Sequence, residues 1–294
     1  MMRRRGGGTT KERVTLTIDN DLLIKVDSTI DNTTIKNRSH AVEVLLRRAL
    51  KNKMPSTAII LAGGRGERLK PSAENTPKTL LTINDLPIVH YNIDLLRRFG
   101  VTNIILSIGG MGEQIKRQYG DGSAHGVRIS YLEEKEPLGT AGCLRLLKGQ
   151  LSETFFMMNA DELKDIDLIR MFEAHVKNQG TATIALWTVE DPSSYGVAML
   201  DGNRILRFVE KPKKEDAPSK LINAGLYLME PEVISYVPEG FAMLEQDVFP
   251  KLAREGKLYG YPFSGQWFDT GTTERFEHAG KEWRGFTKTP ANQQ

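Results

Sequence analysis

The residues best suited to chemistry lie in a glycine-rich segment, LAGGRGERLKP, that begins at Leu61. Glycine lets a backbone turn tightly and point several N–H groups at one anion. Arg68, and Lys78 in the nearby run PKTLL, add positive charge. The β-branched, apolar run at 57–61 predicts a buried strand immediately before the glycines. We therefore interpret the segment as a phosphate-binding turn, with a ligand-free strand-to-helix turn as the alternative.

A second candidate for chemistry is Asp161, which closely follows the apolar run at 154–159. Ligands of open α/β sheets bind at the carboxyl ends of the strands, so a carboxylate in this position could contact a ligand. The same aspartate could instead cap a helix that begins near Asp165. The residues alone leave both alternatives open.

These residues need a scaffold, and from residue 57 onward the sequence alternates between strand and helix patterns. Apolar runs predict strands at 57–61, 103–108, 127–132, 154–159 and 181–188. Helical periodicity predicts helices at 87–99, 111–119, 139–148 and 165–178. Shorter strands are expected at 194–200, 204–209, 221–229 and 258–263, before a last helix near 273–281. This alternation is typical of the α/β class, with helices on a mostly parallel sheet.

The glycine-rich segment resembles the signature of the sugar-1-phosphate nucleotidyltransferases (nucleotide-sugar pyrophosphorylases), which runs GGxGTRLxP followed by PK. The glycines, the arginine and the lysine match, whereas Glu67 replaces the usual Thr or Ser. The resemblance implies a Rossmann-like, mostly parallel mixed sheet of the glycosyltransferase-A-like type. It also implies a nucleotide site formed by Leu61, Ala62, Gly63, Gly64, Gly66, Glu67, Arg68 and Lys78.

Two further motifs extend the resemblance to a metal site. The run NAD at 159–161 is similar to the family's NGD or NAD element, and QWFDTGT at 266–272 is similar to its WxDxGT element. The resemblance implies that Asp161 and Asp269 bind Mg²⁺, a cation that accepts carboxylate oxygens together with phosphates and waters. Mg²⁺ is therefore the expected cofactor.

Three segments resemble the family's sugar-binding elements. They are EKP at 210–212, NAG at 223–225 and PLGTAG at 137–142. Taken alone, the charged EKP run is more typical of an exposed turn. The resemblance implies a sugar-phosphate site formed by Gly139, Glu210, Lys211 and Asn223.

The implied reaction is attack by a sugar 1-phosphate on the α-phosphorus of a nucleoside triphosphate (NTP), with release of pyrophosphate. Because two anions must approach each other, positioning and charge neutralisation are expected to dominate catalysis. Residues 189–197, 207–212 and 245–250 look most like mannose-1-phosphate guanylyltransferases. Glucose-1-phosphate thymidylyl- or uridylyltransferases are one alternative, and a regulator that senses a nucleotide-sugar without catalysis is another. The implied catalytic residues are Arg68, Lys78, Asp161, Lys211 and Asp269.

Residues 11–53 predict a separate small domain. The alternating run at 13–18 predicts a strand, followed by a helix that carries Leu22 to Ile30 and a second helix capped by Ser39. Such a short segment buries too little surface alone, which predicts a homodimer, with a tetramer as a further alternative. The order resembles ribbon-helix-helix domains, whose paired strands enter the major groove of DNA. The resemblance implies contacts to double-stranded DNA from Arg13, Thr15, Thr17, Arg38 and Ser39. A domain that only dimerises the enzyme is the alternative.

The composition indicates a globular protein without a membrane segment. No apolar run approaches the ~20 residues of a membrane span, so we expect a cytoplasmic protein. The single cysteine, Cys143, excludes an internal disulfide and is interpreted as a core residue. Residues 1–53 are basic, with 12 Lys/Arg against 6 Asp/Glu, although the net charge of the chain is only +3. We expect a disordered basic arm at 1–10, the small domain at 11–53 and a nucleotidyltransferase domain at 54–294.

Overall fold

The chain divides into two compact units. The computed structural model describes residues 14–31, 35–51, 53–64 and 76–287. Unit 1 extends to Leu50 and unit 2 begins at Lys51, close to the boundary that we predict between residues 53 and 54. Within the described ranges, no helix has the length and apolar character needed to cross a membrane.

Unit 1 contains two helices among its described residues, α1 (Asn20–Asp27) and α2 (Arg38–Lys51). Asp19 caps α1 by accepting a hydrogen bond from the Asp21 N–H at 2.9 Å. The small core of the unit consists of Val26, Ile35 and Ala41. Large apolar side chains remain exposed, namely those of Val14, Leu16, Leu22, Ile24 and Leu46.

Two predictions for unit 1 differ from the structure. Residues 14–19 form neither helix nor strand. A strand needs a partner, and none of the described strands pairs with this segment; Arg13 lies outside the described residues. The predicted cap of α2 at Ser39 is wrong. Asn37, directly before the helix, accepts the hydrogen bond from the His40 N–H at 2.9 Å. An asparagine in that position is an equally good cap, so Ser39 falls inside the first turn.

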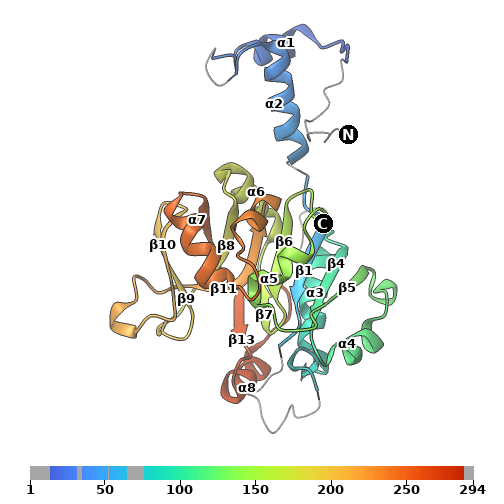
Figure 1. The fold of residues 1–294 in the computed structure, drawn as a ribbon, viewed down its shortest axis with the longest axis vertical. Coiled ribbons are helices and arrows are strands. Elements are labelled where there is room, and N and C mark those ends of the chain that lie inside the picture. The colour runs from blue at the N-terminus through green and yellow to red at the C-terminus, as the bar shows by residue number, and fades with distance from the viewer. Residues whose placement is uncertain (1–13, 32–34, 52, 65–75, 288–294) are drawn as a thin grey trace, which may run out of the picture. The chain divides into compact units, whose positions relative to one another are not determined.

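The core of unit 2 is a nine-stranded sheet (Figure 1) in the order β5-β4-β1-β6-β11-β8-β12-β10-β9. Its strands are β1 (Thr57–Leu61), β4 (Asn103–Ile108), β5 (Arg128–Glu133), β6 (Phe155–Asn159), β8 (Ala182–Thr188), β9 (Gly196–Asp201), β10 (Arg204–Glu210), β11 (Leu221–Met229) and β12 (Leu258–Pro262). Neighbours are parallel from β5 to β6 and between β8 and β12, and antiparallel elsewhere. The prediction of a mostly parallel mixed sheet therefore holds around β1 and for the β8–β12 pair, whereas the other neighbours are antiparallel. Tight connections, such as the β9–β10 turn, make antiparallel neighbours in the second half.

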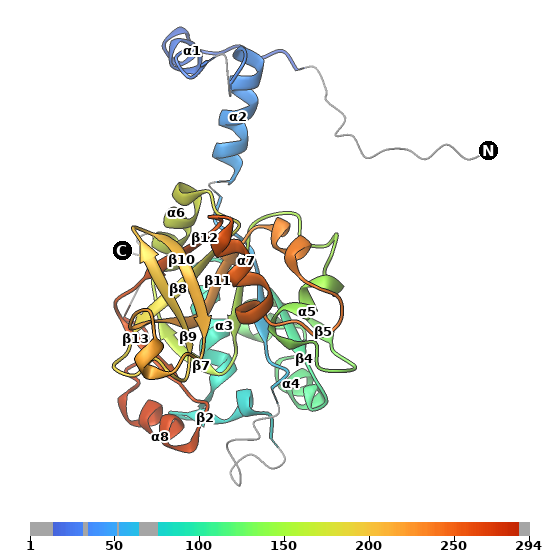
Figure 2. The ribbon, with the colours of Figure 1, turned by 60° about the vertical axis from the view of Figure 1, so that its left-hand side comes forward.

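Helices cover both faces of this sheet. On β1, Ala58 and Ile60 belong to the core formed with α3 (Ile88–Arg98), α4 (Gly112–Tyr119) and α6 (Leu168–Asn178). Ile59 points to the other face, whose core includes α5 (Gly139–Leu146) and α7 (Phe249–Arg254). In Figure 2, α7 lies against the sheet, where it contacts β10. A strand that is buried on both faces explains the continuous apolar run before the glycines.

Two short sheets accompany the main one. The first pairs β7 (Glu162–Asp165) with β13 (Gln266–Asp269), which precedes α8 (Thr273–Glu282), and the second pairs β2 (Thr82–Ile83) with β3 (Leu86–Pro87). β7 and β13 were not predicted. The predicted helix at 165–178 consequently begins later, after Asp167, whose side chain caps α6. Short 3₁₀ helices span Lys78–Leu80, Ser123–His125, Lys214–Asp216 and Pro231–Tyr236, and a π-helical turn spans Leu244–Val248.

Cys143 on α5 is expected to be unreactive in the native protein. Its side chain is buried, and this burial raises the pKa of the thiol to about 12, so little thiolate forms at pH 8. Titration with a chromogenic disulfide reagent at pH 8 should show almost no reaction within minutes, and one thiol per chain after guanidinium is added. Fast labelling without denaturant would contradict the assignment of Cys143 to the core.

Candidate active site

A cleft of about 440 Å³ opens at the carboxyl ends of β1, β4 and β6. The predicted residues that line this cleft are Leu61, Gly63, Gly64, Lys78, Gly139 and Asp161. Ala62 is buried between two of these residues in the sequence. Gly66, Glu67 and Arg68 lie outside the described residues. The structure thus brings the first glycines, one predicted cation and one predicted carboxylate together.

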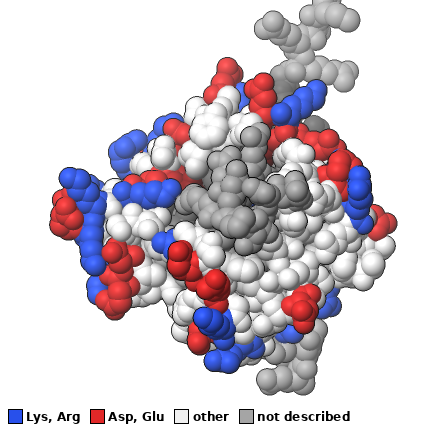
Figure 3. Space-filling model, turned by 90° about the horizontal axis from the view of Figure 1, so that it is seen from below, with Lys and Arg blue, Asp and Glu red and all other residues white. Residues whose placement is uncertain are grey.

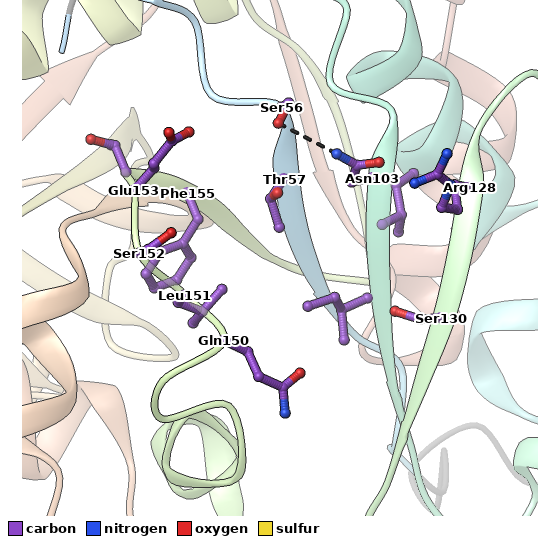
Figure 4. Close-up of a pocket in the computed structure, with 13 residues that line it drawn as sticks. Ser56, Thr57, Asn103, Arg128, Ser130, Gln150, Leu151, Ser152, Glu153 and Phe155 are labelled. Atoms are coloured by element: carbon purple, nitrogen blue, oxygen red, sulfur yellow. Dashed lines mark hydrogen bonds between the residues drawn. The ribbon is translucent and has the colours of Figure 1, made fainter. Parts of the chain in front are cut away.

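A second hollow, of about 320 Å³, lies at the opposite, amino ends of the same strands (Figure 4). Its polar lining includes Ser56, Asn103 and Arg128, and the Asn103 amide donates a hydrogen bond to the Ser56 hydroxyl at 3.4 Å. None of the predicted site residues lines this hollow. Because open α/β sheets bind ligands at the carboxyl ends of their strands, the first cleft is the candidate active site.

Asp161 forms an ion pair with Lys78 in the cleft. The Lys78 ammonium group donates to Asp161 Oδ2, and the Lys78 side chain is only 10% exposed. Burial alone would raise the pKa of Asp161, but Lys78 and the more distant Lys164 outweigh this effect and lower it. Asp161 is therefore ionised at neutral pH and able to bind a cation.

The small β7–β13 sheet brings the backbone at Asp269 close to the backbone at Asp161. Its antiparallel register pairs Asp269 with Glu162, the residue that follows Asp161. The next residue, Thr270, donates hydrogen bonds to the Asp161 carbonyl oxygen from its hydroxyl at 2.8 Å and from its N–H at 3.2 Å. Asp161, in the turn before β7, and Asp269, at the end of β13, thus have neighbouring backbone positions although they are far apart in the sequence.

Both carboxylate oxygens of Asp269 accept hydrogen bonds. Oδ1 accepts one from the Gly271 N–H at 2.6 Å, while Oδ2 accepts one from Arg275 Nη1 at 2.6 Å and one from the Tyr195 hydroxyl at 3.4 Å. Burial and the charge of Asp269 raise the pKa of Tyr195 to about 12, so this hydroxyl remains a donor. Neither Tyr195 nor Arg275 was predicted.

Two further charged residues, also not predicted, are buried on β7. The Lys164 ammonium nitrogen lies 3.4 Å from Glu162 Oε2, and the Lys164 side chain is 0% exposed. The Glu162 carboxylate also accepts hydrogen bonds from the Asn159 amide and the Trp267 indole N–H, both at 2.9 Å. The pair therefore connects β6, β7 and β13, the three strands beside Asp161.

Glu210 and Lys211, at the end of β10, lie on the Asp269 side of the site. The Lys211 N–H donates to the Tyr195 carbonyl oxygen at 3.0 Å, and the hydroxyl of this tyrosine contacts Asp269. The Lys211 side chain is 58% exposed and lies 3.3 Å from a Glu210 carboxylate oxygen. The EKP motif is thus not among the residues that line the cleft, but it lies next to a residue that contacts the second carboxylate.

Asn223 stabilises a turn within β11. Its Oδ1 accepts a hydrogen bond from the Gly225 N–H, and its amide donates to the Tyr227 hydroxyl, both at 2.9 Å. Gly225 has a φ of +57°, and a Cβ there would lie 2.3 Å from a Glu162 oxygen and 2.6 Å from the Asn159 amide nitrogen. Only glycine permits this approach, so the NAG motif brings β11 against the residues that flank Asp161.

Gly139, at the start of α5, also permits a close approach between two segments of the chain. It has a φ of +76°, and a Cβ there would lie 2.4 Å from the Ala242 carbonyl oxygen. The Ala141 N–H donates to this same oxygen at 2.9 Å. The PLGTAG motif thereby holds residues 241–243 against α5, and this segment adds Phe241 and Met243 to the lining of the cleft.

Comparison with known proteins places this site in a family. Residues 57–284 match the sequence profile of a family described as Nucleotidyl transferase. The chain belongs to this family. The family predicted from the glycine-rich segment is thus confirmed.

Several relatives of this nucleotidyltransferase share a function. The chain is 35% identical over 240 residues to mannose-1-phosphate guanylyltransferase of Mycobacterium tuberculosis, a match that covers 80% of this chain and 66% of the relative. It is 37% identical over 225 residues to mannose-1-phosphate guanyltransferase beta-A of Xenopus laevis, a match that covers 74% of this chain and 62% of the relative. The matches thus span slightly less than two thirds of these relatives.

Solved structures confirm the nucleotidyltransferase architecture of unit 2. A putative glucose-1-phosphate thymidylyltransferase from Bacillus anthracis, in complex with sucrose, aligns with a TM-score of 0.73 at 26% identity and covers 80% of this chain and 97% of its own. A UDP-glucose pyrophosphorylase complexed with UDP-glucose aligns with a TM-score of 0.67 at 24% identity, covering 78% and 98%. At this identity, the second likeness concerns the fold alone.

The charged surface of this nucleotidyltransferase is mixed. Figure 3 looks from below, at the end of the molecule where Figure 1 places α8, and shows Lys/Arg and Asp/Glu interspersed around the rim. The described residues of this face therefore form no wide basic surface. Lys78 and Arg275 are cations that pair with the two predicted carboxylates.

Proposed function

We propose that the protein transfers a nucleotidyl group from an NTP to a sugar 1-phosphate, with GTP and mannose 1-phosphate as its substrates. The observation that carries this proposal is that Asp161, directly before β7, and Asp269, at the end of the paired strand β13, lie on neighbouring segments, and that Lys78 pairs with the Asp161 carboxylate. The relatives named as mannose-1-phosphate guanylyltransferases support the choice of substrates.

The attacking oxygen of a sugar 1-phosphate is already an anion, so the reaction needs no general base. It needs two anionic substrates held in line and their charge neutralised. Lys78 would bind the triphosphate, together with Arg68, which the family resemblance alone assigns to this role. The exposed Lys211 side chain can reach outward to the sugar phosphate, and Glu210, Asn223 and Gly139 would contribute to the sugar site.

The residues at the site fit a magnesium ion. Asp161 and Asp269 offer carboxylate oxygens, the ligands that Mg²⁺ prefers. Each carboxylate already forms an ion pair with a cationic side chain. Among the described residues, no group of three or more His, Cys, Asp or Glu could hold a metal ion by itself. The two aspartates would therefore share the ion with substrate phosphates and water. Bound in this way, Mg²⁺ would neutralise phosphate charge.

The second candidate is a glucose-1-phosphate thymidylyl- or uridylyltransferase. It is supported by the likeness to the putative thymidylyltransferase structure. In the family, the glycine-rich loop contacts the nucleotide, and here its Glu67 lies outside the described residues. The choice between the two candidates therefore requires a measurement.

The test is pyrophosphate release by the purified protein with Mg²⁺. GTP, UTP, dTTP, CTP and ATP are each combined with mannose, glucose, galactose and N-acetylglucosamine 1-phosphates. Release mainly from GTP with mannose 1-phosphate supports the proposal, and release mainly from dTTP or UTP with glucose 1-phosphate supports the second candidate. No release from any combination, with nucleotide still bound, would favour a regulator that senses a nucleotide-sugar without catalysis.

We also propose that unit 1 is a homodimeric ribbon-helix-helix module that binds double-stranded DNA. The exposed apolar side chains among its described residues, including Val14 and Leu16, support a dimer, because a second chain would remove them from water. Thr15 and Thr17, which alternate with them, would then face DNA together with Arg13 and Ser39. Pairing of two such dimers would give the tetramer.

Arg38 has an established partner within unit 1. Its guanidinium donates to both carboxylate oxygens of Asp27, at 2.7 and 2.6 Å. A contact between Arg38 and a DNA phosphate would require this bidentate pair to open or to share its donors. The module that only dimerises the enzyme therefore remains the alternative to DNA binding.

Salt dependence distinguishes the two alternatives for unit 1. If the chain contacts about four phosphates, its affinity for a 30-base-pair duplex should fall about 100-fold between 50 and 200 mM salt. A truncated chain that begins at Met54 should not bind the duplex and should be monomeric, as measured by fluorescence anisotropy and analytical ultracentrifugation. A monomeric truncated chain together with no duplex affinity of the full chain would favour dimerisation alone.

A further inference from the structure

Arg275 forms an ion pair with the second predicted metal ligand, Asp269. It lies in the first turn of α8, and its Nη1 donates to Asp269 Oδ2 at 2.6 Å. The Asp269 side chain is only 14% exposed, whereas that of Arg275 is 35% exposed. A charge-assisted hydrogen bond of this length to a largely buried carboxylate is strong. Arg275 therefore occupies Oδ2 of Asp269, an oxygen through which this carboxylate would bind a metal ion.

The other hydrogen bonds of Asp269 also engage its carboxylate oxygens. Its Oδ1 already accepts the Gly271 N–H at 2.6 Å, and the Tyr195 hydroxyl lies 3.4 Å from Oδ2. A metal ion at Oδ2 would meet the positive charge of Arg275 at hydrogen-bonding distance. Because like charges at this distance repel strongly, the guanidinium must move when the metal ion binds.

The surroundings of Arg275 indicate where it would move. Its Cζ lies 5.0 Å from the centre of the Tyr195 ring, and the Tyr195 carbonyl oxygen accepts the Lys211 N–H. Tyr195 thus contacts Arg275 through its ring and the lysine proposed to bind the sugar phosphate through its carbonyl oxygen. A planar guanidinium binds a phosphate group with two hydrogen bonds at once, so a phosphate between Lys211 and Asp269 would receive it.

The first carboxylate shows the same arrangement. Lys78 pairs with Asp161, and this lysine is the one proposed to bind the triphosphate. At Asp161 and at Asp269, a cationic side chain that could bind a phosphate forms an ion pair with a carboxylate that could bind the metal ion.

We propose that Arg275 is a phosphate-binding residue for the sugar 1-phosphate that neutralises Asp269 until the metal ion and this substrate replace it. The inference rests on the proposed function, because it takes Asp269 as a metal ligand and a sugar 1-phosphate as the substrate. It adds Arg275 to the proposed site. It also implies that the metal ion binds weakly to the protein in the absence of substrates.

The test compares Arg275→Gln with Arg284→Gln. Glutamine removes the positive charge of the arginine but keeps a polar, unbranched side chain. Arg284 is a suitable control because it follows α8 and pairs only loosely, at 3.5 Å, with Glu282. Binding of Mn²⁺ alone is measured by electron paramagnetic resonance, without nucleotide. We expect Arg275→Gln to bind Mn²⁺ about tenfold more tightly than the native protein and Arg284→Gln to match the native protein, since loss of one charged hydrogen bond corresponds to about that factor.

The second measurement is the KM for mannose 1-phosphate. It should rise about tenfold in Arg275→Gln, with a smaller rise in Arg275→Lys and an almost unchanged KM for GTP. Equal Mn²⁺ affinity in Arg275→Gln and the native protein, or an unchanged KM for mannose 1-phosphate, would overturn the inference alone. If Asp269→Asn does not weaken Mn²⁺ binding, the metal assignment of the proposed function fails, and the inference fails with it.

Discussion

Asp161→Asn is expected to lower turnover by about three orders of magnitude while the fold remains intact. Asparagine has the same shape as aspartate but no charge, so it can neither hold a divalent cation firmly nor pair with Lys78. Loss of a single group that stabilises developing charge typically reduces turnover 10²–10³-fold, and loss of a metal ligand has at least this effect. The measurement is pyrophosphate release at saturating GTP, mannose 1-phosphate and Mg²⁺.

Asp201→Asn is a matched control for this substitution. Asp201 ends β9, its side chain is 70% exposed, and it pairs only loosely with Arg204 at 3.5 Å. This variant should retain native turnover, and both variants should show the native circular dichroism spectrum. Turnover of Asp161→Asn within a few-fold of the native value would exclude Asp161 as a metal ligand.

Lys164→Met is expected to destabilise the protein by about 3–5 kcal/mol, the usual cost of leaving one member of a buried ion pair without its partner. Methionine fills a similar volume, so the loss arises mainly from the Glu162 carboxylate, which keeps its two neutral donors but no cation. Urea denaturation followed by tryptophan fluorescence measures the free energy of unfolding. Loss of less than about 1 kcal/mol would show that the buried pair contributes little.

The pH dependence gives this prediction a second test. Burial already raises the pKa of Glu162 in the folded protein, and removal of Lys164 should raise it further. A carboxyl group whose pKa is raised by folding stabilises the folded state below its unfolded pKa and loses this contribution as pH rises. The destabilisation by Lys164→Met should therefore be larger at pH 8 than at pH 5. The double variant Glu162→Gln/Lys164→Met should recover part of the loss and show little pH dependence.

The sequence predicts the site best where one local pattern determines both structure and chemistry. The apolar run before Gly63 predicts a strand, which the structure shows to be buried on both faces, and Gly63 and Gly64 follow at its carboxyl end in the cleft. Most strands of the main sheet are predicted within about two residues for the same reason. Asp161 and Asp269 required the family resemblance, because nothing local connects positions so far apart.

The strand β7 could not be predicted, because its pattern is misleading. The run ELKD at 162–165 contains three charged residues, which normally indicate an exposed segment. All four residues are buried, since Glu162 and Lys164 neutralise each other and the partner strand β13 comes from the far end of the domain. Arg275 was overlooked because an arginine in the first turn of a helix has no local feature that distinguishes it from a surface residue.

The order of elements along the chain has a consequence for biosynthesis. The last strand of the nine-stranded sheet ends at Pro262, whereas Asp269 follows on β13, whose Phe268 packs with α8 and Leu163 in a cluster separate from the two sheet cores. On the ribosome, the complete sheet therefore emerges before the second carboxylate. A nascent chain can therefore bury most of its core while it still lacks one of the two carboxylates that we propose to bind the metal ion.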